Sequence, residues 1–447
     1  MDYFSYSSRS SFNGGNRMGV ENNDKIREYI DDVCSQIKFH EIHNDIGLEL
    51  ESHIRELSEE YIAEELTEDE AVEKAITQMG DAFDVGKKLN RIHKPKPDWR
   101  LVILTLIFTG VGLLSLYFIV NSSAREISSS YFTKSLIFNL TGLIIALGLY
   151  FFDYRKIQPL SKYIYVVTLL FLLFTCKTRG ISLHGITFNF AQISTVLFAI
   201  ALPGIFEDWK WQEPKKLLYS LLMYAAPVFL MMVYPSVVSA FIYSVMFMTI
   251  AVASGFKLKY MLTLVGSSVV VMILDALRWP PYKIARLKIF LNPKIDPYGS
   301  GYINAMLYKI VHSAGFWGQG PSANPMKVIP DIHTDFMFAY IIYTFGWAAG
   351  VILVTLIAVF LLRITHTAKN IKNDYGKLMM IGFTTVFAVQ FILHILMILG
   401  LIPVIGVSLP FISYGGSQSI MNMVMVGLIL SIYRRRNIVS NLQTNKI

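Results

Sequence analysis

Cysteine and charged residues, two residue types that decide the class of a protein, are scarce in this sequence. Only two of the 447 residues are cysteines, Cys34 and Cys176, so no disulfide framework or cysteine-based metal site is available. Charged residues make up 16% of the chain and hydrophobic residues 53%. Charge is scarce, and the apolar segments are longer than a globular core requires. Together these two features exclude an ordinary soluble protein.

The few charges are distributed unevenly along the chain. Residues 1–97 contain 12 Lys/Arg and 21 Asp/Glu, whereas residues 98–447 contain 28 Lys/Arg and only 11 Asp/Glu. The positive charge of the second part lies in short segments between apolar runs, which is typical of membrane topology rather than of nucleic-acid binding. We therefore expect contact with membrane lipid and no nucleic-acid partner.

The acidic N-terminal part predicts a small, water-soluble helical domain. Residues 1–23 have no periodicity and are predicted to be disordered, whereas apolar and charged residues alternate at helical spacing over 24–93. Thr67 and Glu70 form the pattern of a capping box at the start of one helix. A cytoplasmic bundle of three or four helices is expected, followed by a Pro-containing linker over 94–100.

The remainder of the chain consists of apolar runs long enough to cross the roughly 30 Å hydrocarbon layer as helices. Alternate short loops are rich in Lys and Arg, so the positive-inside rule places both termini in the cytoplasm and requires an even number of spans. Residues 278–334 then form a large extracellular loop, and residues 434–447 form a basic cytoplasmic tail. The membrane domain, 101–433, is expected to have ten spans, near residues 101–120, 134–152, 162–176, 189–206, 216–234, 235–254, 259–277, 335–362, 378–400 and 415–433.

Asp335 is the main candidate for chemistry, because it lies where the long extracellular loop enters a span. An ionisable residue at such a depth is costly, and partial desolvation would raise its pKa toward values useful to a general base. The alternative is a carboxylate that caps the N-terminus of the helix. The loop before it is rich in Lys and Arg, which favours an anionic ligand such as a phosphate, unless these charges only solvate the loop.

Several segments resemble, in order, the SEDS family of RodA, FtsW and SpoVE. The segments are 285–293, 296–302, Gly315-Phe316-Trp317-Gly318-Gln319-Gly320, His333-Thr334-Asp335-Phe336, and Leu409 to Ser417. The resemblance covers most of residues 98–436 and implies an all-α polytopic membrane protein with about ten transmembrane helices. The N-terminal domain resembles, more loosely, the helical permease-prefix (HAAS-type) module.

The resemblance implies a peptidoglycan glycosyltransferase of the bacterial cytoplasmic membrane. Such an enzyme polymerises lipid II, an undecaprenyl-diphosphate-linked precursor, at the outer face in elongation, division or sporulation, with a class B penicillin-binding protein as partner. The essential aspartate of the family falls on Asp335, the expected catalytic base. The residues expected to contact the substrate are Arg286, Lys288, His333, Thr334, Ser413, Tyr414, Gly415 and Gly416. Arg286 and Lys288 would stabilise the departing diphosphate.

The sequence departs from the family pattern at intramembrane charges. The family has a Glu and a Lys on the fourth span where this chain has Gln192 and Thr195, and a Glu pair where it has Tyr343 and Thr344. Two alternatives therefore stay open: a flippase for lipid-linked precursors, which would not need Asp335 to accept a proton, and a catalytically inactive scaffold for a penicillin-binding protein. No metal-binding motif occurs, and the cofactor stays unknown, with a divalent cation as one candidate.

Two smaller groups of residues complete the sequence-based predictions. Glycines 315, 318 and 320 are expected to supply flexibility rather than to bind phosphate. Polar residues inside the spans, such as Gln390, His394 and Asn422, are expected to make interhelical hydrogen bonds rather than a proton relay.

The topology leads to a first test. A reporter enzyme fused after Lys294 should register outside the cell, and one fused after Lys372 should register inside, because long loops translocate despite their charge whereas short basic loops do not. Activity of paired periplasmic and cytoplasmic reporters measures this. The opposite pattern would overturn the assigned spans.

Overall fold

The computed structural model describes residues 23–93, 97–122, 130–178, 182–183, 186–187, 190–233, 236–257, 266, 290, 301–321, 329 and 331–436. The chain divides into two compact units. One, the N-terminal unit, comprises residues 1–96 together with 437–447, and the other, the membrane unit, comprises residues 97–436. Each unit has its own hydrophobic core.

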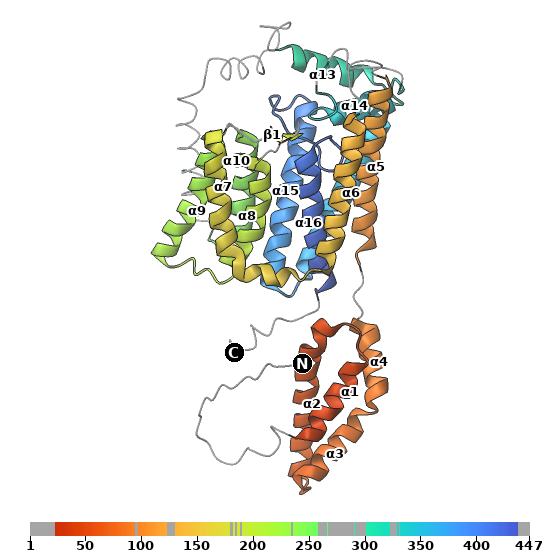
Figure 1. Ribbon diagram of the computed structural model, residues 1–447, viewed down its shortest axis with the longest axis vertical. Coiled ribbons are helices and arrows are strands. Elements are labelled where there is room, and N and C mark those ends of the chain that lie inside the picture. Colours follow the sequence, from red (N-terminus) through yellow and green to blue (C-terminus); the bar gives the residue numbers. More distant parts are fainter. Residues whose placement is uncertain are drawn as a thin grey trace. The chain divides into compact units, whose positions relative to one another are not determined.

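The described part of the N-terminal unit is a bundle of four α-helices (Figure 1). These are α1 (Asp24–Ser35), α2 (His43–Ala63), α3 (Glu68–Met79) and α4 (Ala82–His93), with the 3-10 turn η2 (His40–Ile42) before α2. Apolar residues spaced along the helices meet in one core, in which Val33, Ile54 and Val72 have no exposed surface. The expected disorder of residues 1–23 concerns a segment that, apart from Asn23, lies outside the described residues.

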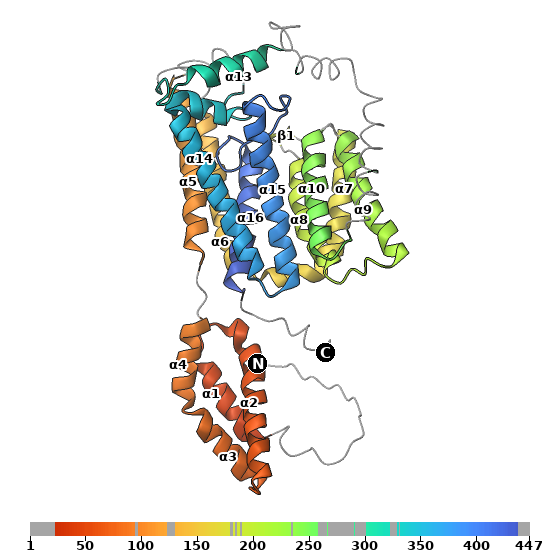
Figure 2. The same ribbon diagram turned by 180° about the vertical axis from the view of Figure 1, so that it is seen from behind.

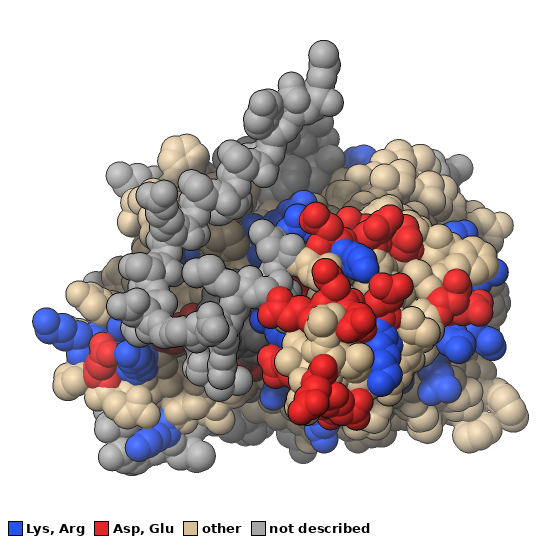
Figure 3. All heavy atoms as spheres, turned by 90° about the horizontal axis from the view of Figure 1, so that it is seen from below, with Lys and Arg blue, Asp and Glu red and all other residues tan. Residues whose placement is uncertain are grey.

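The start of α3 confirms the predicted capping box. The Thr67 hydroxyl donates a hydrogen bond to Glu70 Oε2 at 2.6 Å, and the Thr67 backbone N–H donates to the same oxygen at 3.3 Å. This pair satisfies donors that the first turn of a helix leaves free. Acidic side chains are exposed at the end of α2 and the beginning of α3, and they gather on the surface of this unit (Figure 3).

The membrane unit is built from long apolar helices that lie side by side, as Figures 1 and 2 show from opposite directions. The helices are α5 (Trp99–Ser122), α6 (Ser130–Phe151), α7 (Ser161–Thr178), α8 (Phe190–Phe206), α9 (Pro214–Val233), α10 (Val237–Ala253), α14 (Met337–Lys369), α15 (Asp374–Ile398) and α16 (Gly416–Arg434). Within the described ranges, seven segments are long and apolar enough to span a membrane, and α8 and α10 are shorter apolar helices. Apart from Gly266, the span expected near 259–277 lies outside the described residues.

Shorter elements connect these helices. They are the 3-10 helix η3 (Tyr154–Leu160), the strands β1 (Ser182–Leu183) and β2 (Ile186–Thr187), and helix α13 (Tyr302–Ser313). The two strands form an antiparallel hairpin in which Ser182 faces Thr187. The all-helical polytopic fold expected from the sequence is therefore confirmed, with this small hairpin in addition.

Helices α6 and α16 pack closely because small residues lie along their interface. A Cβ atom added to Gly142 would lie 2.8 Å from the Met423 side chain, and one added to Gly427 would lie 2.8 Å from the backbone of Ala146. Such small residues allow helix backbones to approach each other in a membrane, where lipid offers no hydrophobic driving force. The register of α16 against α6 is set in this way.

Ion pairs and hydrogen bonds fix the C-terminal end of α16. The buried guanidinium of Arg435 donates to the carbonyl oxygens of Phe151 and Phe152 at 3.0 and 3.1 Å, and it lies 3.7 Å from Asp153. These contacts cap the C-terminus of α6, whose last carbonyls lack intrahelical donors. At the same end of the unit, Arg363 pairs with the buried Asp98 at 2.8 Å.

Helix α14 is broken at Gly346, where the backbone has φ 85° and ψ 170°. The groups freed by the break pair with the loop that contains the glycine cluster: Gln319 N donates to Tyr343 O at 2.8 Å, Gly320 N donates to Thr344 O, and Trp347 N donates to Gly315 O. A Cβ atom on Gly318 would lie 2.3 Å from Thr344 O. Gly318 therefore serves close backbone approach, whereas Gly315 and Gly320 have left-handed backbones, with φ 69° and 84°, and nothing within 4 Å of their Cβ positions.

The substitution Gly346→Ala tests this arrangement. The new Cβ would lie 2.1 Å from Phe316 O in a backbone conformation that L-residues avoid. We expect a loss of roughly 1–3 kcal/mol of stability, measured by thermal unfolding of the purified protein. Gly110→Ala in α5 is the control, because nothing lies within 4 Å of its Cβ position. Equal stability of the two variants would contradict the pairing.

Candidate active site

The candidate site lies at the end of the membrane unit where α14 and α16 begin and α15 ends. Two segments form it: the Asp335 turn, residues 331–336, and the Gly406 loop, residues 399–415, which joins α15 to α16. Both segments are made of backbone that is not helical, so each needs partners for its polar groups.

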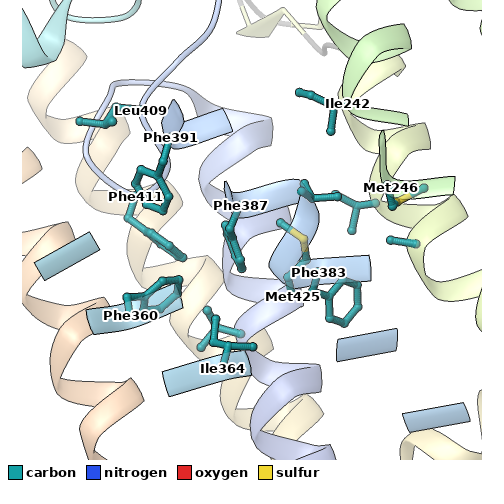
Figure 4. Close-up of a cluster of buried hydrophobic side chains, with 14 of the residues drawn as sticks. Ile242, Met246, Phe360, Ile364, Phe383, Phe387, Phe391, Leu409, Phe411 and Met425 are labelled. Carbon is teal, nitrogen blue, oxygen red and sulfur yellow. The ribbon is translucent and has the colours of Figure 1, made fainter. Parts of the chain in front are cut away.

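The Gly406 loop is anchored in the core by Phe411. Its ring packs against Phe387 and Phe360, at centroid distances of 5.3 Å and 5.8 Å (Figure 4). It also packs against Phe108, at 6.2 Å. Phe411 has φ 66°, a conformation that is costly for a bulky residue. Burial of the ring offsets this strain and fixes the path of the loop.

The Asp335 turn is organised around one carbonyl oxygen. The Thr334 N–H, the Asp335 N–H and the Thr334 hydroxyl all donate to Asp331 O, at 3.0, 3.2 and 2.9 Å respectively. Asp331 itself has φ 55°, the left-handed conformation that Asp tolerates better than most residues. The turn therefore holds the Asp335 backbone in one orientation just before α14 begins.

The loop and the turn are joined directly. Tyr414 N donates to His333 O at 2.9 Å. The His333 ring packs edge-on against Tyr131 of α6 at a centroid distance of 5.1 Å, and Tyr414 packs against the same tyrosine at 5.1 Å. Ser413 stabilises the loop internally, because its hydroxyl oxygen accepts from Leu409 N at 2.9 Å. These contacts bring α6, α14 and α16 together at one point.

The Asp335 carboxylate is partly buried, and the backbone of the Gly406 loop lies against it: a Cβ atom added to Gly406 would be 3.4 Å from Asp335 Oδ2. Burial, together with the charge of Asp331, raises the pKa of Asp335 to about 6. No hydrogen bond from a described residue to this carboxylate is found, and the side chain does not cap α14. The helix-capping alternative is thus not supported by the described residues.

His333 has the properties of a neutral hydrogen-bonding group. It is 8% exposed, and burial lowers its pKa although the Asp331 charge opposes this effect. Its Nδ1 has no hydrogen-bond partner among the described residues. A buried polar atom without a partner is costly, and a bound ligand could satisfy it.

The structure brings together most of the residues that the sequence singled out. Asp335, His333 and Thr334 share one turn, and Ser413 and Tyr414 lie in the loop that contacts it. The two cationic candidates, Arg286 and Lys288, lie outside the described residues.

The two consecutive glycines at the start of α16, which are expected to contact the substrate, differ in conformation and packing. Gly415 is extended, with φ −176°, a conformation open to any residue. Gly416 is needed for packing, because its Cβ would lie 2.7 Å from the Phe138 ring of α6. Neither position shows the left-handed backbone that favours glycine in turns.

Sequence reasoning missed Gly406 and assigned His394 only a general role. His394 makes the expected interhelical contact, since it bridges α14 and the Gly406 loop. By contrast, Gln390 Oε1 and Asn422 Nδ2 have no partners among the described residues. A glycine in a loop of unknown path gives no sequence signal, so only the fold could reveal its contact with Asp335.

The fourth apolar helix, α8, is neutral at the position where the family pattern has a lysine. Thr195 is buried, and its hydroxyl donates to Ala191 O at 2.9 Å within the same helix. In the part of the chain that the structure describes, no three His, Cys, Asp or Glu side chains are grouped as a metal site would require.

The fold and this site define the class: a polytopic helical membrane protein with a partly buried carboxylate at the end of a broken span. The sequence profile of FtsW, RodA and SpoVE, described as cell cycle proteins, matches residues 97–438. The chain therefore belongs to the FtsW/RodA/SpoVE family.

Individual relatives agree with this assignment. The chain is 26% identical over 367 residues to the probable peptidoglycan glycosyltransferase FtsW of Thiomicrospira cyclica, covering 78% of this chain and 94% of that protein. Its fold resembles a chain from a structure of a peptidoglycan synthase complex that coordinates polymerisation and crosslinking, with TM-score 0.64 and 22% identity over 77% of this chain and 99% of that one. It also resembles Thermus thermophilus RodA, with TM-score 0.57 and 19% identity over 76% and 98%.

The raised pKa of Asp335 predicts a pH dependence. A reaction that needs the ionised carboxylate should be fastest above about pH 7 and should slow tenfold per unit below pH 6, because the carboxylate becomes protonated as the pH falls through its pKa of about 6. An aspartate with an ordinary pKa would keep its activity down to about pH 4. Initial rates across this range distinguish the two profiles.

Proposed function

We propose that this chain is a peptidoglycan glycosyltransferase that polymerises lipid II, with Asp335 as its general base. One observation carries the proposal: the carboxylate at the family's essential position is partly buried, accepts no hydrogen bond from a described residue, and has a pKa raised to about 6. A base of this kind is ionised at neutral pH but binds a proton more readily than an ordinary aspartate.

The proposed step transfers one proton and exchanges one bond. Asp335 takes the proton of the sugar 4-hydroxyl of the acceptor as that oxygen attacks the anomeric carbon of the donor. A new C1–O4 bond forms, the bond from C1 to the diphosphate oxygen breaks, and undecaprenyl diphosphate leaves with the electron pair. The protonated Asp335 then returns its proton to solvent, so no further reactant is needed.

Neighbouring residues have supporting roles in this proposal. His333, neutral and with Nδ1 unpaired among the described residues, would accept or donate one hydrogen bond to the substrate, depending on its tautomer. Thr334 and Tyr414 would line the same site. We propose that Arg286 and Lys288 stabilise the departing diphosphate by charge.

We propose that the Asp335 end of the membrane unit faces outward and that both termini are cytoplasmic. Asp335 lies two residues before α14 begins, and Arg363 lies near the other end of this helix, whose 33 residues would span roughly 50 Å if straight. Arg363 contacts Tyr433 of α16, next to Arg434 and the buried Arg435. The positive-inside rule favours the cytoplasm for this arginine-rich end.

We further propose that residues 24–93 are a separable cytoplasmic module of the permease-prefix type and that a class B penicillin-binding protein is the partner. The linker expected over 94–100 ends earlier, because α5 begins at Trp99. Support for the module comes from its own core and capped helices. Support for the partner comes from the resemblance to a chain of a peptidoglycan synthase complex.

The substitution Asp335→Asn tests the proposed base. It keeps the shape of the side chain but removes the proton acceptor, so we expect at least a hundredfold loss of glycan polymerisation with unchanged membrane insertion. Glycan ladders formed from lipid II by the purified protein, with and without a penicillin-binding protein, provide the measurement. Asp374→Asn is the control, because Asp374 is an exposed carboxylate at the other end of the unit.

The same assay separates the alternatives. Polymerisation by Asp335→Asn at the wild-type rate would refute the assigned base. Wild-type protein that never forms glycan, but moves lipid II across vesicle membranes, would identify a flippase. Absence of both activities, with binding to a penicillin-binding protein retained, would identify a scaffold.

Deletion of residues 1–93 tests the independence of the N-terminal unit. We expect the membrane unit to insert and to polymerise within about twofold of the full chain, because each unit has its own core. Glycan ladders of the two purified proteins give the comparison. Normal insertion with complete loss of polymerisation would show that this unit is coupled to catalysis.

A further inference from the structure

His394 is a fully buried side chain on α15 that contacts two other parts of the site. Its Nδ1 lies 2.7 Å from Val407 O, and its Nε2 lies 3.4 Å from Phe338 N. Val407 follows Gly406 in the loop, and Phe338 lies three residues after Asp335 in the first turn of α14. One imidazole therefore connects the Gly406 loop to the start of the helix that carries Asp335.

These two contacts fix the tautomer of His394. The backbone N–H of Phe338 can only donate, so Nε2 must accept, and the Val407 carbonyl can only accept, so Nδ1 must carry the proton. Both contacts are satisfied only by a neutral ring. A neutral ring with both nitrogens occupied cannot relay protons, so the role of His394 is to hold backbone in place.

The contact with Val407 determines where the neighbouring residue lies. Gly406 is close enough to Asp335 that a Cβ atom on it would be 3.4 Å from Oδ2. We propose that His394 is a positioning residue that holds the Gly406 loop against the Asp335 carboxylate and so keeps water from one side of the proposed base. The position of the loop does not depend on the proposed function, whereas the effect of His394 on the reaction rests on that function.

The other titratable groups around Asp335 do not replace this contact. Among the described residues, Asp331 and His333 lie on the same turn as Asp335, and Tyr131 of α6 and Tyr414 of the loop contact His333. Burial is the larger cause of the raised pKa of Asp335, and the charge of Asp331 is the second cause. Since burial is the larger cause, the position of the covering loop should govern the titration of Asp335.

Three variants of the full chain test the proposal. His394→Phe keeps a ring of similar size and removes both hydrogen bonds. His394→Asn places an N–H group where Nδ1–H was, so it keeps the contact with Val407 O and loses the contact with Phe338 N. Thr384→Val is the matched control, because Thr384 is on the same helix and its hydroxyl donates only to Met380 O of that helix.

Two measurements are made on each purified variant. The first is an infrared titration of the protonated Asp335 carboxyl band, identified by its absence from Asp335→Asn, which requires no substrate. The second is the initial rate of lipid II polymerisation against pH. We expect His394→Phe to lower the titration midpoint by about one unit or more, because water reaches the carboxylate, and to lower kcat tenfold or more with little change in KM.

The conservative variant and the control should behave differently from His394→Phe. His394→Asn should keep a midpoint near 6 and polymerise within about twofold of wild type, and Thr384→Val should match wild type in both measurements. A merely structural role would predict equal losses for His394→Asn and His394→Phe. A wild-type midpoint in a folded His394→Phe protein would overturn the proposal.

Gly406→Ala provides a second variant in case His394→Phe does not fold. Its methyl group would contact the carboxylate and exclude further water, so the midpoint should rise by about half a unit or more, opposite in sign to His394→Phe. An unchanged midpoint would overturn the proposal. The two measurements test the two hypotheses separately. If the wild type forms no glycan, the proposed glycosyltransferase function fails. The shifts of the infrared titration midpoint still decide whether His394 positions the Gly406 loop.

Discussion

The hydrogen-bonding requirement of backbone in hydrocarbon is the constraint on which the membrane unit depends. Lipid supplies no partners, so every interruption of a helix must be matched by another segment. The break of α14 at Gly346 is matched by the glycines between 315 and 320, whose backbone groups pair with those freed by the break. Three backbone groups of the loop before α16 also find partners: Tyr414 N donates to His333 O, Leu409 N donates to the Ser413 hydroxyl, and Val407 O accepts from His394.

The same requirement explains how a reactive carboxylate is held at the end of a span. Non-helical backbone at this depth is tolerated where it is buried in protein or lines a cavity, and the Asp335 turn and the Gly406 loop satisfy each other there. Burial at this position, together with the charge of Asp331, raises the pKa of Asp335 to about 6. Stability of the fold and the chemistry proposed for the site therefore have one physical origin.

The departures from the family pattern replace charge with neutral residues, and the structure accommodates one of them, Thr195, locally. Its hydroxyl donates within its own helix, whereas at Tyr343 and Thr344 the backbone carbonyls, not the side chains, accept from the glycine loop. An interior without these charges avoids the desolvation penalty that a buried ion pair carries. In the proposed mechanism the charge needed for chemistry is confined to the Asp335 end of the membrane unit.

The sequence by itself determined the helical membrane architecture and the capping box of α3, because hydrophobic runs and cap residues act through local chemistry. It also predicted Asp335 as the candidate base, because an acid at the end of a span is costly unless it has a function. The tertiary structure alone decided that Gly318 and Gly346 serve close backbone approach and that Gly416 packs on Phe138. It also decided that Gly406 lies against the Asp335 carboxylate and that His394 contacts the neighbouring Val407. These roles depend on contacts between segments distant in sequence, and a glycine or histidine shows no pattern that reveals its partner before the chain has folded.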